Sequence, residues 1–221
     1  VAAQLDPRNV AVVHENADAA VFRPSRAGAF RARVGIPDDA PVVAVVGRID
    51  TWKGIDVLLE AWPHAKAARS DLLLVVAGGP VAGKTDYFAA LAARAHGLAD
   101  VHWLGPRDDV ADLYADADLV VVPSTEPEPY GLVAVEALAS GTPIIASDAG
   151  GLPEIVASAH PGAGTLVPPG DVDALASALV DAIERAGPTS TAIRAARPPL
   201  REPEPDRYAE LLRSVLPDAH P

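Results

Sequence analysis

The sequence predicts a Rossmann-like α/β fold, in which helices cover both faces of a parallel β-sheet. Short, nearly continuous apolar runs such as PVVAVV, LLLVVA and DLVVVP indicate strands that are buried on both faces. These runs alternate with amphipathic stretches, a pattern typical of right-handed strand–helix–strand crossovers. The 221 residues, of which 49% are hydrophobic, are enough for one such domain.

Each element follows from this alternation in chain order. The apolar runs predict strands near residues 41–46, 72–77, 100–104, 118–123, 143–147 and 164–167. The amphipathic stretches predict helices near residues 54–68, 86–96, 109–116, 131–140, 151–157 and 171–186. Pro63 is expected to kink or end the first helix, because its ring clashes with the carbonyl four residues earlier.

The two ends of the chain lack this alternation. Residues 1–26 are interpreted as an N-terminal interdomain segment, with VAVV at 10–13 as a short strand candidate. Residues 27–186 are the expected Rossmann-like domain. Residues 187–221 are predicted to form a proline-rich extended linker and then a C-terminal helix, because helical spacing returns at 206–216.

Composition excludes several classes of protein. The formal charge is −12, and a surface of this sign without a basic patch repels nucleic acid. No apolar run is long enough to span a bilayer, and the absence of Cys excludes disulfides and thiolate metal sites. A cytoplasmic location is the default. Met is absent even at position 1, so the chain is interpreted as part of a longer or processed protein.

The first candidate site is the motif GRIDTWKG at residues 47–54, between the first strand and its helix. Arg48 and Lys53 are expected at the carboxyl end of that strand, where ligands bind to parallel sheets. A guanidinium and an ammonium can share a diphosphate, the first through forked hydrogen bonds and the second as a point charge. Alternatively, Arg48 pairs with Asp50 or Asp56 and Lys53 is solvated.

The second candidate site is EPEPYGLVAVE at residues 126–136. Gly131 opens a helix whose first amides lack intrahelical partners and form an anion site with the helix dipole. Glu136 lies in an otherwise apolar helix, where a carboxylate needs a partner, and it could reach a group beside the phosphate such as a ribose diol. Glu128 could reach a sugar, although Glu126 is an equally acidic neighbour. Alternatively, Glu136 is a surface residue or a partner of the helix dipole.

A competing motif is GGPVAGKT at residues 78–85, which matches the P-loop pattern of nucleotide triphosphatases. Such an enzyme also needs an acidic Mg²⁺ partner at the end of another strand. Asp148 is the nearest candidate, but a tight turn at Gly150 and Gly151 explains its surroundings better. The alternative is a glycine-rich connection with a solvated Lys84.

Other polar and aromatic residues are assigned structural roles. The histidines show no metal-ligand spacing, and the tryptophans are interpreted as packing residues, although Trp52 could shape a pocket beside Lys53. An acidic cluster around the predicted helix at 109–116 is expected to be solvated. It consists of Asp108, Asp109, Asp112, Asp116 and Asp118.

Several ordered motifs resemble the C-terminal domain of the glycosyltransferase group 1 family, retaining enzymes of GT-B fold. The resemblance covers about residues 10–186 and rests on GRIDTWKG, VHWLG, GTLVPPGD and, above all, EPYGLVAVEALASGTPIIASDAGGLPEIV. It implies that the chain is one half of a GT-B fold and binds a nucleoside diphosphate sugar. It also implies that an N-terminal acceptor-binding domain is missing.

The resemblance implies roles at matching positions. Arg48 and Lys53 would bind the donor diphosphate, Glu128 would contact the transferred sugar, and these three are the candidate catalytic residues. Glu136 would bind the ribose hydroxyls, and the base would lie by the loop at 105–107. The residues expected around the donor are Gly47, Gly79, Arg107, Tyr130, Gly131, Leu132, Val133 and Glu136.

The implied reaction moves a sugar from the donor to an acceptor hydroxyl with its anomeric configuration retained. Positive charge and a helix end stabilise the leaving diphosphate, so neither a metal nor another cofactor is expected. The missing domain could bring the protein to a membrane. The alternative from another class is a non-catalytic nucleotide-sugar-binding module.

Overall fold

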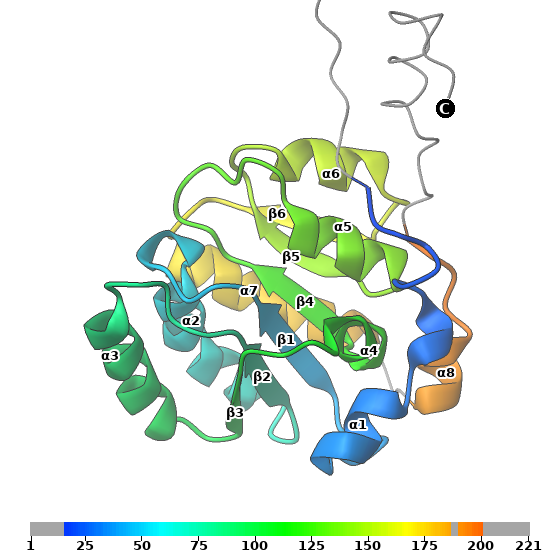
Figure 1. Cartoon of the computed structure of the whole chain (residues 1–221), viewed down its shortest axis with the longest axis horizontal. Helices are drawn as coiled ribbons and strands as arrows, with labels where there is room; N and C mark the ends of the chain where they lie inside the picture. The colour runs from blue at the N-terminus through cyan, green and yellow to red at the C-terminus, as the bar shows by residue number, and fades with distance from the viewer. Residues whose placement is uncertain (1–15, 187–189, 201–221) are drawn as a thin grey trace, which may run out of the picture.

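The structure, a computed structural model, describes residues 16–186 and 190–200. It confirms the α/β, Rossmann-like fold. Six strands form one parallel sheet in the order β3-β2-β1-β4-β5-β6 (Figure 1). The strands are β1 Val42–Val46, β2 Leu73–Ala77, β3 Val101–Gly105, β4 Leu119–Val122, β5 Ile144–Ser147 and β6 Gly164–Val167.

The predicted helices are present, and further short ones occur near both ends of the described chain. The α-helices are α1 Ala29–Val34, α2 Ile55–Ala68, α3 Thr85–His96, α4 Val110–Asp116, α5 Leu132–Ala139, α6 Leu152–Ser158, α7 Val172–Ala186 and α8 Thr191–Ala195. Two 3₁₀ turns, η2 Pro24–Arg26 and η3 Thr51–Lys53, lie before α1 and α2.

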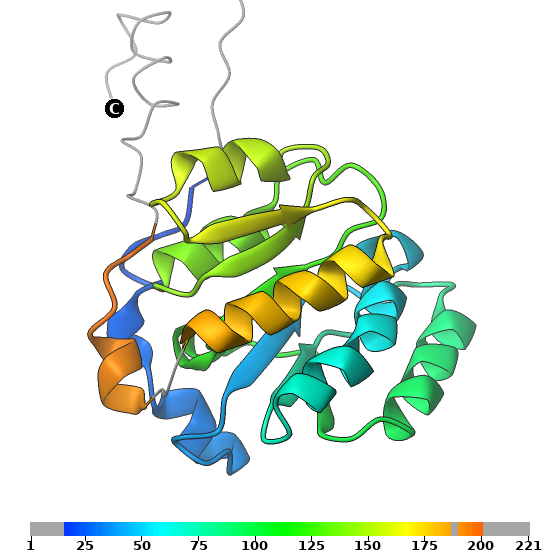
Figure 2. The same cartoon turned by 180° about the vertical axis from the view of Figure 1, so that it is seen from behind.

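Helices cover both faces of the sheet and make a separate apolar core with each. One core joins the sheet to α2, α3 and α7, and of these α2 and α7 lie in front of the sheet in Figure 2. The other joins it to α1, α4, α5 and α6, and α4 and α5 lie in front of the sheet in Figure 1. This double cover explains why the strand sequences are apolar almost without interruption.

The order of the strands creates a crevice at one edge of the sheet. β1 pairs with β2 on one side and with β4 on the other, although β2 and β3 separate β1 from β4 in the chain. The crossovers therefore diverge at β1 and β4, and ligands of such sheets bind at the carboxyl ends of the strands at this point. Gly47 follows β1 and Pro123 follows β4.

Pro63 was expected to kink or end its helix, and the structure shows that it does not end it. Helix α2 runs for 14 residues with Pro63 inside it. Pro63 is exposed, whereas Leu58, Leu59 and Trp62 are buried against the sheet. The burial of this apolar face outweighs the loss of one backbone hydrogen bond. The buried Trp62 also has the packing role expected of it.

The region expected to be an extended linker contains a short helix within residues 190–200. Ser190 caps α8 by accepting a hydrogen bond from the amide of Ile193. Arg194 of this helix is fully buried. The proline-rich composition of this region gave no indication of the helix. Contacts with residues distant in the chain stabilise it instead. The strand candidate at 10–13 and the helix expected at 206–216 lie outside the described residues.

The expectation that the acidic cluster is solvated is wrong for three of its members. Asp112, Asp116 and Asp118 are buried. Asp118 contacts Arg31 of α1 at 3.0 Å and Arg194 of α8 at 3.2 Å. These arginines come from parts of the chain that local sequence does not place beside the cluster.

Candidate functional site

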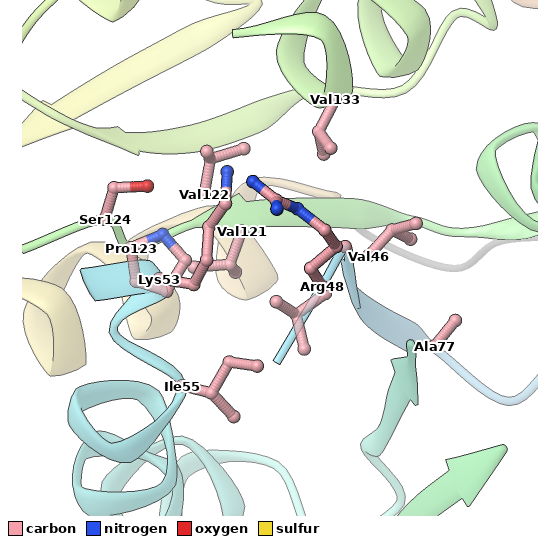
Figure 3. Close-up of a pocket in the computed structure, with 12 residues that line it drawn as sticks. Val46, Arg48, Lys53, Ile55, Ala77, Val121, Val122, Pro123, Ser124 and Val133 are labelled. Carbon is pink, nitrogen blue, oxygen red and sulfur yellow. The ribbon is translucent and has the colours of Figure 1, made fainter. Parts of the chain in front are cut away.

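An open cavity of about 370 Å³ lies at the carboxyl ends of β1 and β4. It is lined by Gly47, Arg48, Trp52, Lys53, Val122, Glu128, Pro129, Tyr130, Gly131, Leu132 and Val133. A much smaller cavity adjoins it and shares Gly47, Arg48, Lys53, Val122 and Val133 (Figure 3). The two motifs singled out in the sequence therefore meet in one place.

Arg48 and Lys53 point into the same space, between the end of β4 and Val133 of α5 (Figure 3). Arg48 is exposed, and within residues 16–186 and 190–200 its side chain makes no ion pair or hydrogen bond. The alternative pairing with Asp50 or Asp56 does not occur. Asp50 instead accepts hydrogen bonds from Thr51 and Trp52, and Asp56 accepts one from a tyrosine of α3.

Lys53 has a defined environment rather than a solvated one. Its Nζ lies 2.6 Å from Oε2 of Glu128 and 4.1 Å from the centroid of the Trp52 ring. The same Glu128 oxygen accepts a hydrogen bond from the buried hydroxyl of Ser124 at 3.0 Å. Glu128 is buried, whereas Glu126 is exposed, so the structure distinguishes the two acidic neighbours. The sequence analysis did not identify Ser124 as a residue of the site.

Close backbone contacts hold the loops that carry Lys53 and Glu128. The amide of Gly151 donates to the carbonyl of Glu128, and a Cβ on Gly150, whose φ is +65°, would lie 2.3 Å from that carbonyl oxygen. A Cβ on Gly54 would lie 1.9 Å from the carbonyl oxygen of Pro123. Only glycine permits either approach. The double glycine therefore supports Glu128.

The start of α5 forms another wall of the cavity. Gly131 precedes the helix, and its carbonyl accepts from the amides of Ala134 and Val135. The amides of Leu132 and Val133 have no intrahelical acceptor, so they and the helix dipole favour an anion in the cavity. Tyr130 is 64% exposed beside this helix end.

Glu136 lies one helical turn beyond Val133 and is half-buried. Its Oε2 accepts a hydrogen bond from the hydroxyl of Tyr114 of α4 at 3.0 Å. Burial raises the pKa of Glu136, and the hydrogen bond from Tyr114 lowers it in part. Glu136 is thus not a free surface residue, and Tyr114 is a partner that the sequence analysis missed.

Gly79 and Arg107, which were expected near a base, do not line either of the two cavities. Their loops nevertheless touch, since the amide of Gly78 donates to the carbonyl of Gly105. Arg107 forms two hydrogen bonds with Asp109. Hydrogen bonds from Arg107, and also from Arg33, lower the pKa of Asp109 to about 2.

Three amides of the loop at 78–85 are already used within the protein and are not free to bind a phosphate. The amides of Gly78, Val81 and Lys84 donate to carbonyl oxygens of the protein itself. The ammonium of Lys84 lies 3.9 Å from a carboxylate oxygen of Asp50. A phosphate would have to replace these contacts, which weighs against this interpretation of the motif.

Residues 16–186 and 190–200 contain neither a candidate membrane-spanning helix nor a candidate metal-binding cluster. In these ranges no helix has both the length and the apolar character needed to cross a membrane. Side chains of His, Asp and Glu do not gather there in a group of three or more that could hold a metal ion.

Comparison of the whole sequence with known families identifies the family of this chain. The sequence model of the family described as "Glycosyl transferases group 1" matches residues 27–197. The chain belongs to this family. Like the GT-B glycosyltransferases of known structure, it has a six-stranded parallel sheet flanked by helices.

Among curated relatives, D-inositol 3-phosphate glycosyltransferase of Mycobacterium avium is 41% identical over 193 residues. The match covers 85% of this chain and 44% of that protein. The chain therefore spans less than half the length of this relative.

Among solved structures, HepE of Anabaena in complex with UDP and glucose is similar with a TM-score of 0.74 and 28% identity. The match covers 94% of this chain and 56% of HepE. The C-terminal domain of a group 1 family glycosyl transferase, LpcC of Francisella tularensis, has the same fold at a TM-score of 0.66 and 23% identity. Here the match covers 93% of this chain and all of that domain.

Proposed function

We propose that this chain is the donor-binding part of a glycosyltransferase and holds a nucleoside diphosphate sugar in the cavity between β1 and β4. The observation that carries the proposal is the convergence of Arg48, Lys53 and the free amides of α5 on one cavity. Although the formal charge of the chain is −12, two cations and the N-terminus of a helix lie together here. This arrangement suits a small anionic ligand.

Uridine diphosphate is the first nucleotide to test, because HepE of Anabaena, a similar protein, binds UDP. In this proposal Arg48 and Lys53 bind the two phosphates. The amides of Leu132 and Val133 bind the distal phosphate, and Glu136 accepts hydrogen bonds from the ribose. Gly79 and Arg107 lie toward the base.

The chemical step is departure of the nucleoside diphosphate from the anomeric carbon of the sugar. Negative charge grows on the leaving phosphate, and Arg48, Lys53 and the start of α5 stabilise it. Glu128, held by Ser124 and Lys53, contacts the sugar. The cations already supply the positive charge that a divalent metal would provide, so donor binding is proposed to be metal-independent and a chelator should leave it unchanged.

The acceptor is proposed to bind to a second domain that this chain does not contain. The chain would then bind donor without transferring sugar, whereas the full-length protein would transfer it with retention, which NMR of the product tests. A non-catalytic nucleotide-sugar-binding module remains the second candidate, because the match covers only 44% of the curated relative. Binding without transfer by the full-length protein would favour it.

The test is calorimetric titration of the chain with UDP, GDP, ADP and UMP. One diphosphate should bind, and UMP should bind at least about tenfold more weakly than UDP because it lacks one charged phosphate. Lys53→Ala should lower affinity for the diphosphate by about tenfold or more. Absence of binding by all four nucleotides would refute the proposal.

Lys84→Ala is the matched control, because it removes an ammonium from the competing motif. It should change diphosphate affinity less than about twofold. The reverse result, in which Lys84→Ala abolishes nucleotide binding and Lys53→Ala does not, would establish the P-loop alternative.

A further inference from the structure

Tyr114 is fully buried, and its hydroxyl makes one hydrogen bond within the described part of the chain. Its ring lies in the core between α4, α5 and the sheet, 6.1 Å from the ring of Phe22. Its hydroxyl donates to Oε2 of Glu136 at 3.0 Å. Phenylalanine would fill the same space, so the hydroxyl adds only this hydrogen bond.

The backbone of Tyr114 is also held in place. The hydroxyl of Thr142, which is buried in the turn before β5, donates to the carbonyl of Tyr114 at 2.6 Å. Burial, together with the nearby Glu136 carboxylate, raises the pKa of the Tyr114 hydroxyl well above its usual range. The hydroxyl therefore keeps its proton and remains a donor in a fixed position.

Glu136 makes no hydrogen bond or ion pair other than that from Tyr114 within residues 16–186 and 190–200. It lies in α5, which has the sequence LVAVEALA, and all the other residues of this helix are apolar. A carboxylate there has no packing advantage over an apolar side chain, and one oxygen can still accept further hydrogen bonds. Leu132 and Val133 line the cavity. Glu136 is not a lining residue, but it follows them by about one helical turn on the same side of α5, and helical side chains lean toward the N-terminus.

From this contact we propose that Tyr114 is a positioning residue: it orients Glu136 so that the free carboxylate oxygen receives the ribose hydroxyls of the nucleotide. The inference rests on the proposed donor-binding function and assigns a role to a residue outside the cavity lining. Tyr114 touches neither the nucleotide nor the sugar, and it acts only through Glu136.

The test compares UDP with 2′,3′-dideoxyuridine 5′-diphosphate, which lacks both ribose hydroxyls, by calorimetry. The unchanged chain should bind UDP about tenfold more tightly than the dideoxy probe. Tyr114→Phe should lower affinity for UDP about fivefold and change affinity for the dideoxy probe less than twofold. In the Glu136→Gln background, Tyr114→Phe should have no further effect.

Tyr87→Phe is the matched control, because it removes a hydroxyl that donates to Asp56 on the opposite face of the sheet. It should leave the affinity for both probes unchanged. Thermal unfolding of each variant identifies any that fail to fold, and Thr142→Val then supplies a second perturbation of the Tyr114 position with the same expected selectivity for UDP.

The outcomes separate this inference from the proposed function. Equal loss of both probes in Tyr114→Phe would show a merely structural role and overturn the inference. Equal affinity of the unchanged chain for both probes would also overturn it, while donor binding stood. No binding of UDP, GDP or ADP by the unchanged chain would refute the proposed function itself.

Discussion

Arginine side chains at the two ends of β1 and β4 differ in whether they have partners. At the amino ends, Arg31 and Arg194 are buried and their charges are met by Asp118 and Asp116. At the carboxyl ends, Arg48 is exposed and its side chain has no partner within the described residues. The same residue type is therefore structural at one edge and available to a ligand at the other.

The partners at the amino ends explain this difference. The carboxylate of Asp116 accepts hydrogen bonds from the amides of Phe30 and Arg31, and Asp118 accepts one from the amide of Val42. These contacts join α1, α4, α8 and the sheet. Burial lowers the pKa of Arg31, and its aspartate partners raise it in part. Arg31 and Arg194, which are both buried and paired with aspartates, are therefore not accessible to a ligand.

The largest expected effect is on stability, at the amino-end cluster. Asp118→Asn should lower the free energy of unfolding by about 3–5 kcal/mol, because it removes the buried carboxylate that contacts both Arg31 and Arg194. Urea denaturation at neutral pH measures this loss. Asp71→Asn, which removes a carboxylate from an exposed pair with Arg69, is the control and should change it by less than about 0.5 kcal/mol. A loss below about 1 kcal/mol for Asp118→Asn would contradict the structural role assigned to the charges at the amino ends.

The next effect is on binding, at the carboxyl-end cavity. Arg48→Ala should weaken UDP binding by about 10- to 100-fold, or about 1.4–2.8 kcal/mol, because forked hydrogen bonds to a phosphate are lost. Its free energy of unfolding should stay within about 0.5 kcal/mol of the unchanged chain. Titration calorimetry and urea denaturation of the same samples check both. A variant that binds UDP normally but unfolds more easily would reverse the assignment of Arg48.

The smallest effect concerns Asp109, whose partners Arg33 and Arg107 are partly exposed. The folded pKa of about 2 lies below the unfolded value, so the carboxylate stabilises the fold above about pH 4 and loses this effect as pH falls toward 2. Asp109→Asn should lower the free energy of unfolding by about 1 kcal/mol at pH 6. The difference should shrink between pH 4 and pH 2.

Denaturation across this pH range is the measurement, with Asp108→Asn as control because Asp108 is exposed. An Asp109→Asn deficit that stayed constant down to pH 2 would contradict the assigned pKa. The two effects on stability, at the buried cluster and at the partly exposed Asp109, rank by the degree of desolvation of each charge.

Much of the fold was predictable because apolar periodicity reports burial directly. The predicted strand near 118–123 corresponds to β4 at Leu119–Val122, and the helix near 86–96 corresponds to α3 at Thr85–His96. The juxtaposition of Arg48, Lys53 and Gly131 was predictable too, since the carboxyl ends of parallel strands share one edge. Their roles in binding stay predictions until a nucleotide is titrated.

The partners of these residues were not predictable. Ser124 follows β4 after Pro123, and a polar residue at this strand end is the one signal that could have indicated its contact with Glu128. Tyr114 gave no such signal, because an aromatic residue at helical spacing is expected simply to pack. Its partner Glu136 is 22 residues away in the chain.

The sequence alone determined which segments form strands buried on both faces and which loop, at residues 47–54, carries both cations, because periodicity and strand ends are local properties of the chain. Only the tertiary structure decided which charges are neutralised. Asp118 meets Arg194 across 76 residues, and Lys53 meets Glu128 across 75. Whether a charged side chain is paired or open to a ligand depends on neighbours that folding brings together from distant parts of the chain, and no local pattern encodes those neighbours.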